Sequence, residues 1–235
     1  MRRALAFLTI VGGSAEPTAT TFAWFPLVGA GLGFAVGAVW WVVARHGAPA
    51  LAAALAIVAD LALTGLLHVD GLADAGDGLL APMARERRLA VMAEPTIGAF
   101  GAVSVVAVLV VRFAALASAR PAPVVIAALW CASRTAMVAI SQVVPYARTG
   151  GIVSAFVGNR RRWVVVAAVV VGLAGSVALG ARCGIHGVTS VLGALIGAAL
   201  VAAFARRRLG GYTGDVLGAS GIVGETVGLA LWALR

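Results

Sequence analysis

Long apolar stretches alternate with short polar connections along the whole chain, a pattern typical of proteins built from membrane-spanning helices. A helix of about 20 apolar residues crosses about 30 Å of hydrocarbon. Windows of about this length cover residues 27–44, 48–69, 97–119, 121–144, 163–181, 187–205 and 213–234. The sequence therefore predicts an all-α fold: a polytopic transmembrane helix bundle of about seven spans, forming one integral membrane domain over residues 1–235.

Composition supports this prediction and excludes several other classes of protein. Hydrophobic residues make up 62% of the chain and charged residues 11%, against about 45–50% and about 25% in ordinary soluble domains. A soluble globular enzyme, a disordered tail and a disulfide-rich module are therefore excluded. The two cysteines, Cys131 and Cys183, are far apart and indicate neither a disulfide nor a zinc site.

All 18 basic residues are arginines, and their distribution predicts the orientation in the membrane. Twelve arginines fall in alternate connections that include the N-terminus: Arg2, Arg3, Arg85, Arg87, Arg88, Arg148, Arg160, Arg161, Arg162, Arg206, Arg207 and Arg208. The opposite connections carry four: Arg45, Arg120, Arg182 and Arg235. Because cytoplasmic loops carry an excess of basic residues, we expect a cytoplasmic N-terminus.

The segment before the first span contains a basic end, a short apolar run and an aromatic group. Residues 1–13 resemble a weak signal peptide. The excess of arginines on one side of the membrane is nevertheless obtained with this segment kept in the protein. Phe22, Trp24 and Phe25 precede the first span and are expected to anchor it at the membrane interface.

Three of the nine acidic residues lie within eight positions, in the run HVDGLADAGDGLL. Asp70, Asp74 and Asp77 are spaced so that a helix would carry them on one face. Carboxylates so close repel one another unless a cation lies among them, and oxygen ligands of this kind suit Mg²⁺. We therefore expect a Mg²⁺ site here, although a solvated acidic turn is the simpler alternative. His68 projects away from Asp70 and is expected to be structural, acting as a base only if the helix breaks.

A second acidic site opens the last predicted span, in the run GGYTGDVLGA. Glycine-rich backbone entering a helix offers free N–H groups to a phosphate. Thr213, Gly214 and Asp215 lie at the same predicted depth as the three aspartates. We expect them to take part in the same site.

Four further ionisable residues fall within predicted spans, where charged side chains are functional candidates. Asp60, Arg134 and Glu225 each lie about 15 Å below the cytoplasmic end of their span. We expect a buried cluster with Arg134 between Asp60 and Glu225. For Arg112, snorkelling and a pair with Asp60 are both open. Arg134 and Arg148 stand at the two ends of a series of residues with helical spacing. From there both could contact a diphosphate.

Together these motifs resemble the cobalamin synthase family (adenosylcobinamide-GDP ribazoletransferase). The runs that carry the resemblance are HVDGLADAGDGLL, IGAFG at 97–101, SRTAMV, PYAR at 145–148 and GGYTGDVLGA. The resemblance implies a Mg²⁺-dependent enzyme of the bacterial cytoplasmic (inner) membrane, with its active site facing the cytoplasm. Its substrates are adenosylcobinamide-GDP and α-ribazole or its 5′-phosphate. GMP is released, and adenosylcobalamin or its phosphate is formed.

The resemblance also implies roles for individual residues. Asp70, Asp74 and Asp77 would hold Mg²⁺ against the diphosphate, and Asp215 would complete the metal site or act as a base. The remaining matched positions would bind substrate: Arg134, Arg148, Thr213, Gly214 and Glu225.

The chain departs from the family pattern at two places. Residues 8–12 read LTIVG where an arginine and a proline are usual, and Glu94 stands where aspartate is common.

Two other functions remain open on the residues alone. A CDP-alcohol phosphotransferase also groups aspartates on a helix, but its usual motif is incomplete here. A transporter would use the cluster of charges within the membrane.

Overall fold

The structure is a computed structural model that describes residues 1–235 except 12, 14–17, 19 and 149–161. Its elements in chain order are α1 (Arg2–Leu8), η1 (Phe22–Trp24), α2 (Phe25–Ala44), α3 (Pro49–Thr64), α4 (Leu67–Leu80), α5 (Arg85–Val91), α6 (Ala99–Ser118), α7 (Pro123–Val143), α8 (Arg162–Ala181), α9 (Gly184–Leu209) and α10 (Gly214–Ala233). The predicted all-α class is confirmed.

The predicted number of membrane spans is also close to what the structure contains. Within the described residues, six helical segments are long and apolar enough to cross a membrane: 22–44, 99–118, 123–143, 163–181, 184–209 and 214–233. A seventh span would combine α3 and α4, which meet at an angle of 91°.

The prediction of one continuous span over 48–69 is wrong, because the chain breaks in its second half. Gly65 and Leu66 both have a left-handed backbone, with φ of 57° and 63°. A left-handed residue after the last helical one is a common way for a helix to end, and two in succession redirect the chain. The apolar run continues through the break, so hydropathy alone does not reveal it.

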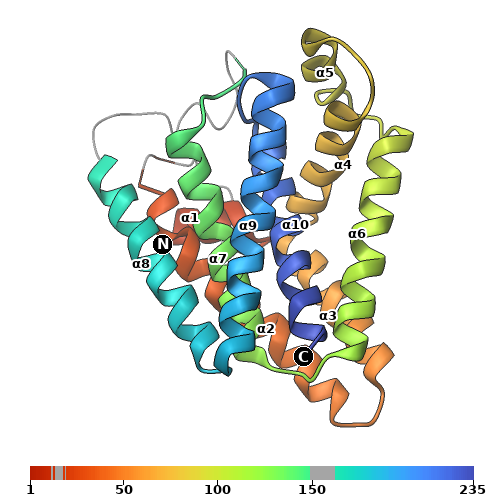
Figure 1. Cartoon of the computed structure of the whole chain (residues 1–235), viewed down its shortest axis with the longest axis vertical. Coiled ribbons are helices and arrows are strands. Elements are labelled where there is room, and N and C mark those ends of the chain that lie inside the picture. Colours follow the sequence, from red (N-terminus) through yellow and green to blue (C-terminus); the bar gives the residue numbers. More distant parts are fainter. Residues whose placement is uncertain (12, 14–17, 19, 149–161) are drawn as a thin grey trace.

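Two helices form the centre of the bundle and the others surround them. Most of α7 and α10 is buried, whereas α6 and α8 expose most of their surface. The exposed side chains of α6 are large and apolar, among them Val103, Val106 and Val110. An apolar outer surface is what a helix facing lipid requires. Figure 1 shows α7 and α10 running between the outer helices.

Close packing of α2 on α7 depends on a glycine stripe along one face of α2. A Cβ atom on Gly33 would lie 2.5 Å from the carbonyl oxygen of Ile126, and Gly29 and Gly37 are equally confined. Small residues spaced by four let helix backbones approach closely in lipid. These glycines therefore allow the close approach of α2 and α7.

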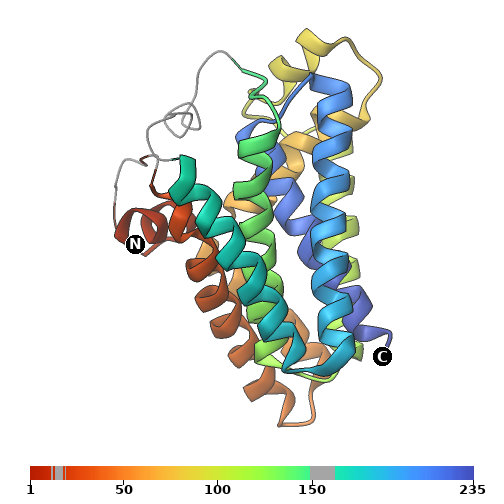
Figure 2. The same ribbon diagram turned by 60° about the vertical axis from the view of Figure 1, so that its left-hand side comes forward.

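The connections between the long helices gather at the two ends of the bundle. One end carries α5, the start of α6 and the last turn of α9, with its arginines Arg206–Arg208. The other end carries the α2–α3, α6–α7 and α8–α9 connections and the C-terminus (Figures 1 and 2). Beside the bundle, α1 and η1 pack against α2. The arginines of α5 and of the last turn of α9 thus lie at one end, and those of the α2–α3, α6–α7 and α8–α9 connections lie at the other.

Candidate active site

The break after α3 places α4 between α6 and α10, where the acidic residues meet. A Cβ atom on Gly71 would lie 3.0 Å from the carbonyl oxygen of Asp215. The backbones of α4 and α10 can approach this closely because Gly71 has no side chain. At the far end of α4, buried Arg88 donates hydrogen bonds to the carbonyl oxygens of Gly78 (2.7 Å) and Leu79 (3.1 Å). These bonds satisfy terminal carbonyls of α4.

The three aspartates all lie on the continuous helix α4, the condition under which their spacing predicts a shared face. Asp70 is exposed, Asp74 is half-buried and Asp77 is buried. Asp74 interacts electrostatically with Asp70, Asp77 and Asp215, and also with Arg148. The two acidic motifs therefore lie within electrostatic range of each other around Asp74, with Arg148 as the neighbouring cation.

Asp77 has a partner that the sequence did not predict. Its carboxylate oxygens accept hydrogen bonds from the backbone N–H groups of Gly98 (2.7 Å) and Gly101 (2.8 Å) at the start of α6. A Cβ atom on either glycine would lie 2.5 Å from this carboxylate. Asp77 thus caps the N-terminus of α6 from the side of α4.

Asp215 lies in the first turn of α10, which begins at Gly214 as the glycine-rich run suggested. Thr213 is the N-cap of this helix. Its hydroxyl accepts a hydrogen bond from the N–H of Val216 (3.3 Å) and donates one to Asp215 Oδ2 (3.1 Å). The positive end of the α10 dipole therefore lies beside the acidic cluster.

Arg148 closes the polar side of the site. Its Nη2 lies 3.2 Å from Asp215 Oδ2 and donates a hydrogen bond to the carbonyl oxygen of Met92 (3.1 Å). The helical stripe expected to join Arg134 and Arg148 is wrong, because α7 ends at Val143 and Arg148 follows in an extended segment.

Two tyrosines fasten the segment that carries Arg148 to the start of α10. The N–H of Ala147 donates to the carbonyl of Tyr212 (2.8 Å), and the N–H of Tyr212 donates to that of Pro145 (2.9 Å). The rings of Tyr146 and Tyr212 pack edge to face, 5.3 Å apart. Burial raises the pKa of Tyr212 to about 12 and also raises the pKa of Tyr146. Both hydroxyls therefore stay protonated at neutral pH.

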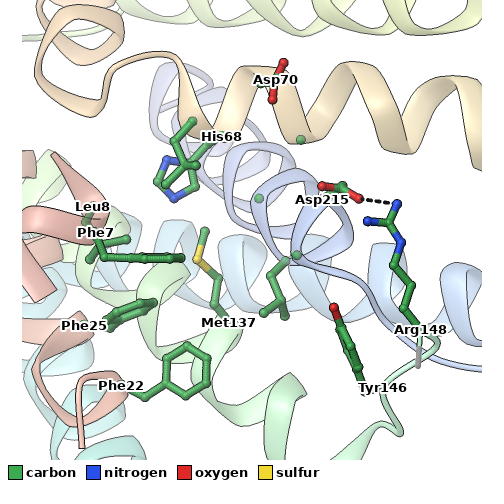
Figure 3. A pocket seen from close by; sticks show the side chains of 15 residues that line it. Phe7, Leu8, Phe22, Phe25, His68, Asp70, Met137, Tyr146, Arg148 and Asp215 are labelled. Atoms are coloured by element: carbon green, nitrogen blue, oxygen red, sulfur yellow. Dashed lines mark ion pairs between the residues drawn. The ribbon is translucent and has the colours of Figure 1, made fainter. Parts of the chain in front are cut away.

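A cavity of about 370 Å³ opens beside this cluster, with one polar end and one apolar end. The polar end is lined by Asp70, Tyr146, Arg148, Gly214 and Asp215. The apolar end is lined by Phe7, Leu8, Phe22, Phe25, Leu67, Met137 and Leu217. The imidazole of His68 lies between the two ends, and the ion pair of Arg148 and Asp215 lies on the polar side (Figure 3).

Several residues of this cavity were not predicted as site residues. Phe22 and Phe25 were expected to be interface anchors, but both are 2% exposed and line the cavity, whereas Trp24 is exposed. His68 is buried, and its Nδ1 has no hydrogen-bond partner in the described structure. The aromatic residues at positions 7, 22 and 25 were the available signal, but the sequence does not show that they converge.

A second buried cluster contains the other predicted charges and borders the cavity without lining it. Arg112 Nη1 lies 2.9 Å from Asp60 Oδ2, and Arg112 also pairs with Glu225. Arg134 pairs with Glu225 as well. The expectation that Arg134 lies between Asp60 and Glu225 is therefore wrong: Arg112 occupies that position, because α6 packs against both α3 and α10.

This second cluster is closed and electrically balanced. Ser133 donates a hydrogen bond to Glu225 (2.7 Å), and Trp130 donates one to Asp60 (3.1 Å). None of Asp60, Arg112, Arg134 and Glu225 lines the cavity described above. Arg134 and Glu225, which we predicted to bind substrate, thus have each other as partners.

The carboxylates of the acidic cluster are oxygen ligands of the type that a hard divalent cation takes. Mg²⁺ typically takes one or two carboxylates and completes its shell with water and substrate phosphates. Within the described residues, no group of three or more histidine, cysteine or acidic side chains is arranged to hold a metal ion directly. Asp70, Asp74 and Asp215 remain available, whereas Asp77 is engaged by α6. Glu94, a further candidate, instead pairs with Arg87 at 3.0 Å.

Comparison with known proteins agrees with these motifs. A family model described as cobalamin-5-phosphate synthase matches residues 1–233. A relative from Chlorobium phaeovibrioides is 33% identical over 98% of this chain and 92% of its own length. One from Bradyrhizobium diazoefficiens is 37% identical over 97% and 90%. Both are named adenosylcobinamide-GDP ribazoletransferase. No solved structure matches the chain. The chain belongs to the cobalamin-5-phosphate synthase family.

Proposed function

We propose that this protein transfers the adenosylcobinamide-phosphate part of adenosylcobinamide-GDP to α-ribazole or its 5′-phosphate, with release of GMP. The observation that carries the proposal is the meeting of Asp70, Asp74 and Asp215 with Arg148 beside a two-ended cavity. The names of the relatives support the donor and the acceptor.

The reaction forms one phosphorus–oxygen bond and breaks another. A ribose hydroxyl of the acceptor attacks the phosphorus next to the cobinamide side, and the bond to the GMP phosphate breaks. The hydroxyl proton passes to a carboxylate, for which Asp215 is well placed at the polar end of the cavity. Arg148 neutralises negative charge on the departing phosphate, as guanidinium groups do in phosphoryl transfer.

The acidic cluster supports a requirement for Mg²⁺. Four carboxylates close together repel one another, and Arg148 offsets one charge. Asp70 and Asp74 would hold the ion, with water and substrate phosphates completing its shell. Bound Mg²⁺ supplies charge stabilisation to the phosphoryl oxygens of the transition state. The positive-inside rule, applied to the arginine-rich end of the bundle, supports a site on the cytoplasmic face of a bacterial inner membrane.

The proposal is tested with the purified protein in detergent. We expect GMP release that requires adenosylcobinamide-GDP, an acceptor and Mg²⁺ together. Running the assay with α-ribazole and with its 5′-phosphate identifies the acceptor. A protein that folds but releases no GMP with either acceptor would overturn the proposal.

The first variant to test is Asp74→Asn, because Asp74 is the carboxylate around which the others gather. Loss of one charge removes a cation ligand and should lower turnover by at least about a hundredfold, within the range for groups that stabilise transition-state charge. Glu86→Gln is the matched control, since Glu86 is an exposed acid on α5. Full Mg²⁺-dependent activity in the Asp74 variant would remove this residue from the site.

A further inference from the structure

The apolar end of the cavity is lined by side chains that favour a flat, apolar ring as the bound group. Phe25 stacks on Phe7, with ring centroids 5.8 Å apart, and meets Phe22 edge to face at 4.9 Å. Met137 of α7 and Leu217 of α10 complete the lining. Aromatic and thioether side chains of this kind pack against flat, apolar rings.

His68 is the polar side chain next to this aromatic group. Its imidazole projects from the first turn of α4 into the cavity (Figure 3). The side chain is buried, and its Nδ1 lacks a partner among the described residues. A buried polar atom without a partner is costly, so a ligand that supplies a hydrogen bond here is favoured.

We propose that this end of the cavity binds the base of the acceptor, with the aromatic side chains packing on its flat ring system and His68 hydrogen-bonding its free ring nitrogen. This inference rests on the proposed function. The base of α-ribazole is a dimethylated benzimidazole, which is planar and apolar and has one unsubstituted ring nitrogen that accepts a hydrogen bond. The imidazole meets that acceptor with an N–H group.

The donor's guanine is a poorer match for the same space. Guanine carries several hydrogen-bond donors and acceptors along its edge, and an apolar lining with one imidazole would leave most of them unpaired. The whole donor, a corrinoid joined to a nucleotide, is several times larger than a cavity of about 370 Å³. A riboside of a bicyclic base suits a cavity of this size.

The orientation of the acceptor follows from the two ends of the cavity. With the base among the phenylalanines, the ribose extends past His68 toward Asp70 and Asp215. Its hydroxyl then reaches the carboxylates, while the donor's diphosphate approaches along the exposed face of Asp70 and Arg148. The aromatic residues thus become determinants of acceptor specificity.

Steady-state kinetics with each substrate varied separately tests the inference. Phe25→Ala should raise KM for the acceptor at least about tenfold, as expected for lost apolar contacts in a specificity pocket, while KM for adenosylcobinamide-GDP changes less than about twofold. Phe25→Leu should show the same pattern more weakly if the alanine variant folds poorly. Phe34→Ala is the control, because Phe34 lies on the same helix but is exposed. An unchanged acceptor KM in a folded Phe25 variant overturns the inference.

An acceptor analogue isolates the role of His68. A dimethylindole riboside has a C–H group in place of the free ring nitrogen. His68→Phe should weaken binding of α-ribazole, measured as loss of its thermal stabilisation of the protein, and leave the indole analogue unaffected. The inference is overturned if the variant loses thermal stabilisation equally with both ligands, or if only the KM for the donor rises. A wild-type protein that releases no GMP would instead overturn the proposed function.

Discussion

At the residue scale, Asp74 and Asp77 of α4 have different surroundings. Substitution of Asp77 should therefore lower stability, whereas substitution of Asp74 should lower turnover. Asp77 caps α6 through the N–H groups of Gly98 and Gly101. Asp77→Ala leaves both donors unpaired and should lower the free energy of unfolding by about 1–2 kcal/mol, the cost of a lost helix cap. The thermal unfolding midpoint in detergent measures this loss.

Asp74→Asn provides the comparison for this prediction, because no backbone cap depends on Asp74. We expect its unfolding midpoint to be equal to or above that of the wild-type protein, because the substitution relieves repulsion among the carboxylates, while turnover is lost. If Asp77→Ala unfolds at the wild-type temperature, the cap contributes nothing and Asp77 returns to the candidates for a direct cation ligand.

At the scale of helices, hydropathy predicts the long elements well and fails where a helix ends inside an apolar run. The predicted windows at 97–119 and 121–144 correspond closely to α6 and α7. By contrast, Leu66 is an apolar residue with a left-handed backbone. A non-glycine residue rarely adopts this conformation, so the residue type at position 66 gives no sign of it.

The candidate site shows the same division between local and long-range information. The spacing of Asp70 and Asp74 is a local property, and a helix carries it into the structure unchanged. The pairing of Arg112 with Asp60 joins residues 52 positions apart, so it depends on which helices are neighbours. For the same reason, the sequence did not reveal that Phe7 and Phe25 share a cavity.

The contact between α2 and α7 yields a prediction at this scale. Gly33→Leu places a side chain against the backbone of Ile126, whereas a Cβ atom on Gly31 would meet nothing within 4 Å. Overpacking of a tight contact costs about 1–3 kcal/mol. We therefore expect a lower unfolding midpoint for Gly33→Leu and little change for Gly31→Leu, since both replacements alter helix propensity equally. Similar midpoints for the two variants would show that α2 and α7 do not rely on this close approach.

Across the whole molecule, the buried charge cluster joins four helices: α3, α6, α7 and α10. Glu225→Gln leaves Arg112 and Arg134 without their shared carboxylate, and breaking a buried pair typically costs about 3–5 kcal/mol. The unfolding midpoint should fall sharply, while the acceptor KM of the remaining folded protein stays near the wild-type value because Glu225 does not line the cavity. A stable variant with a raised KM would instead make Glu225 a substrate-binding residue.

The orientation of the whole bundle decides which compartment supplies the nucleotide-linked donor. The acidic cluster lies toward the end that carries α5 and the α9 arginines, since Asp77 binds the start of α6 and Asp215 follows the last turn of α9. A variant without Cys131 and Cys183 can carry one cysteine at Glu86, on α5, or one at His46, at the opposite end; both positions are exposed. With a membrane-impermeant maleimide on intact cells, we expect labelling at position 46 and protection at position 86 until the membrane is opened. Because the arginine distribution and the active-site end are linked by the same helices, the reverse pattern would place the carboxylates outside the cytoplasm, away from cellular nucleotides.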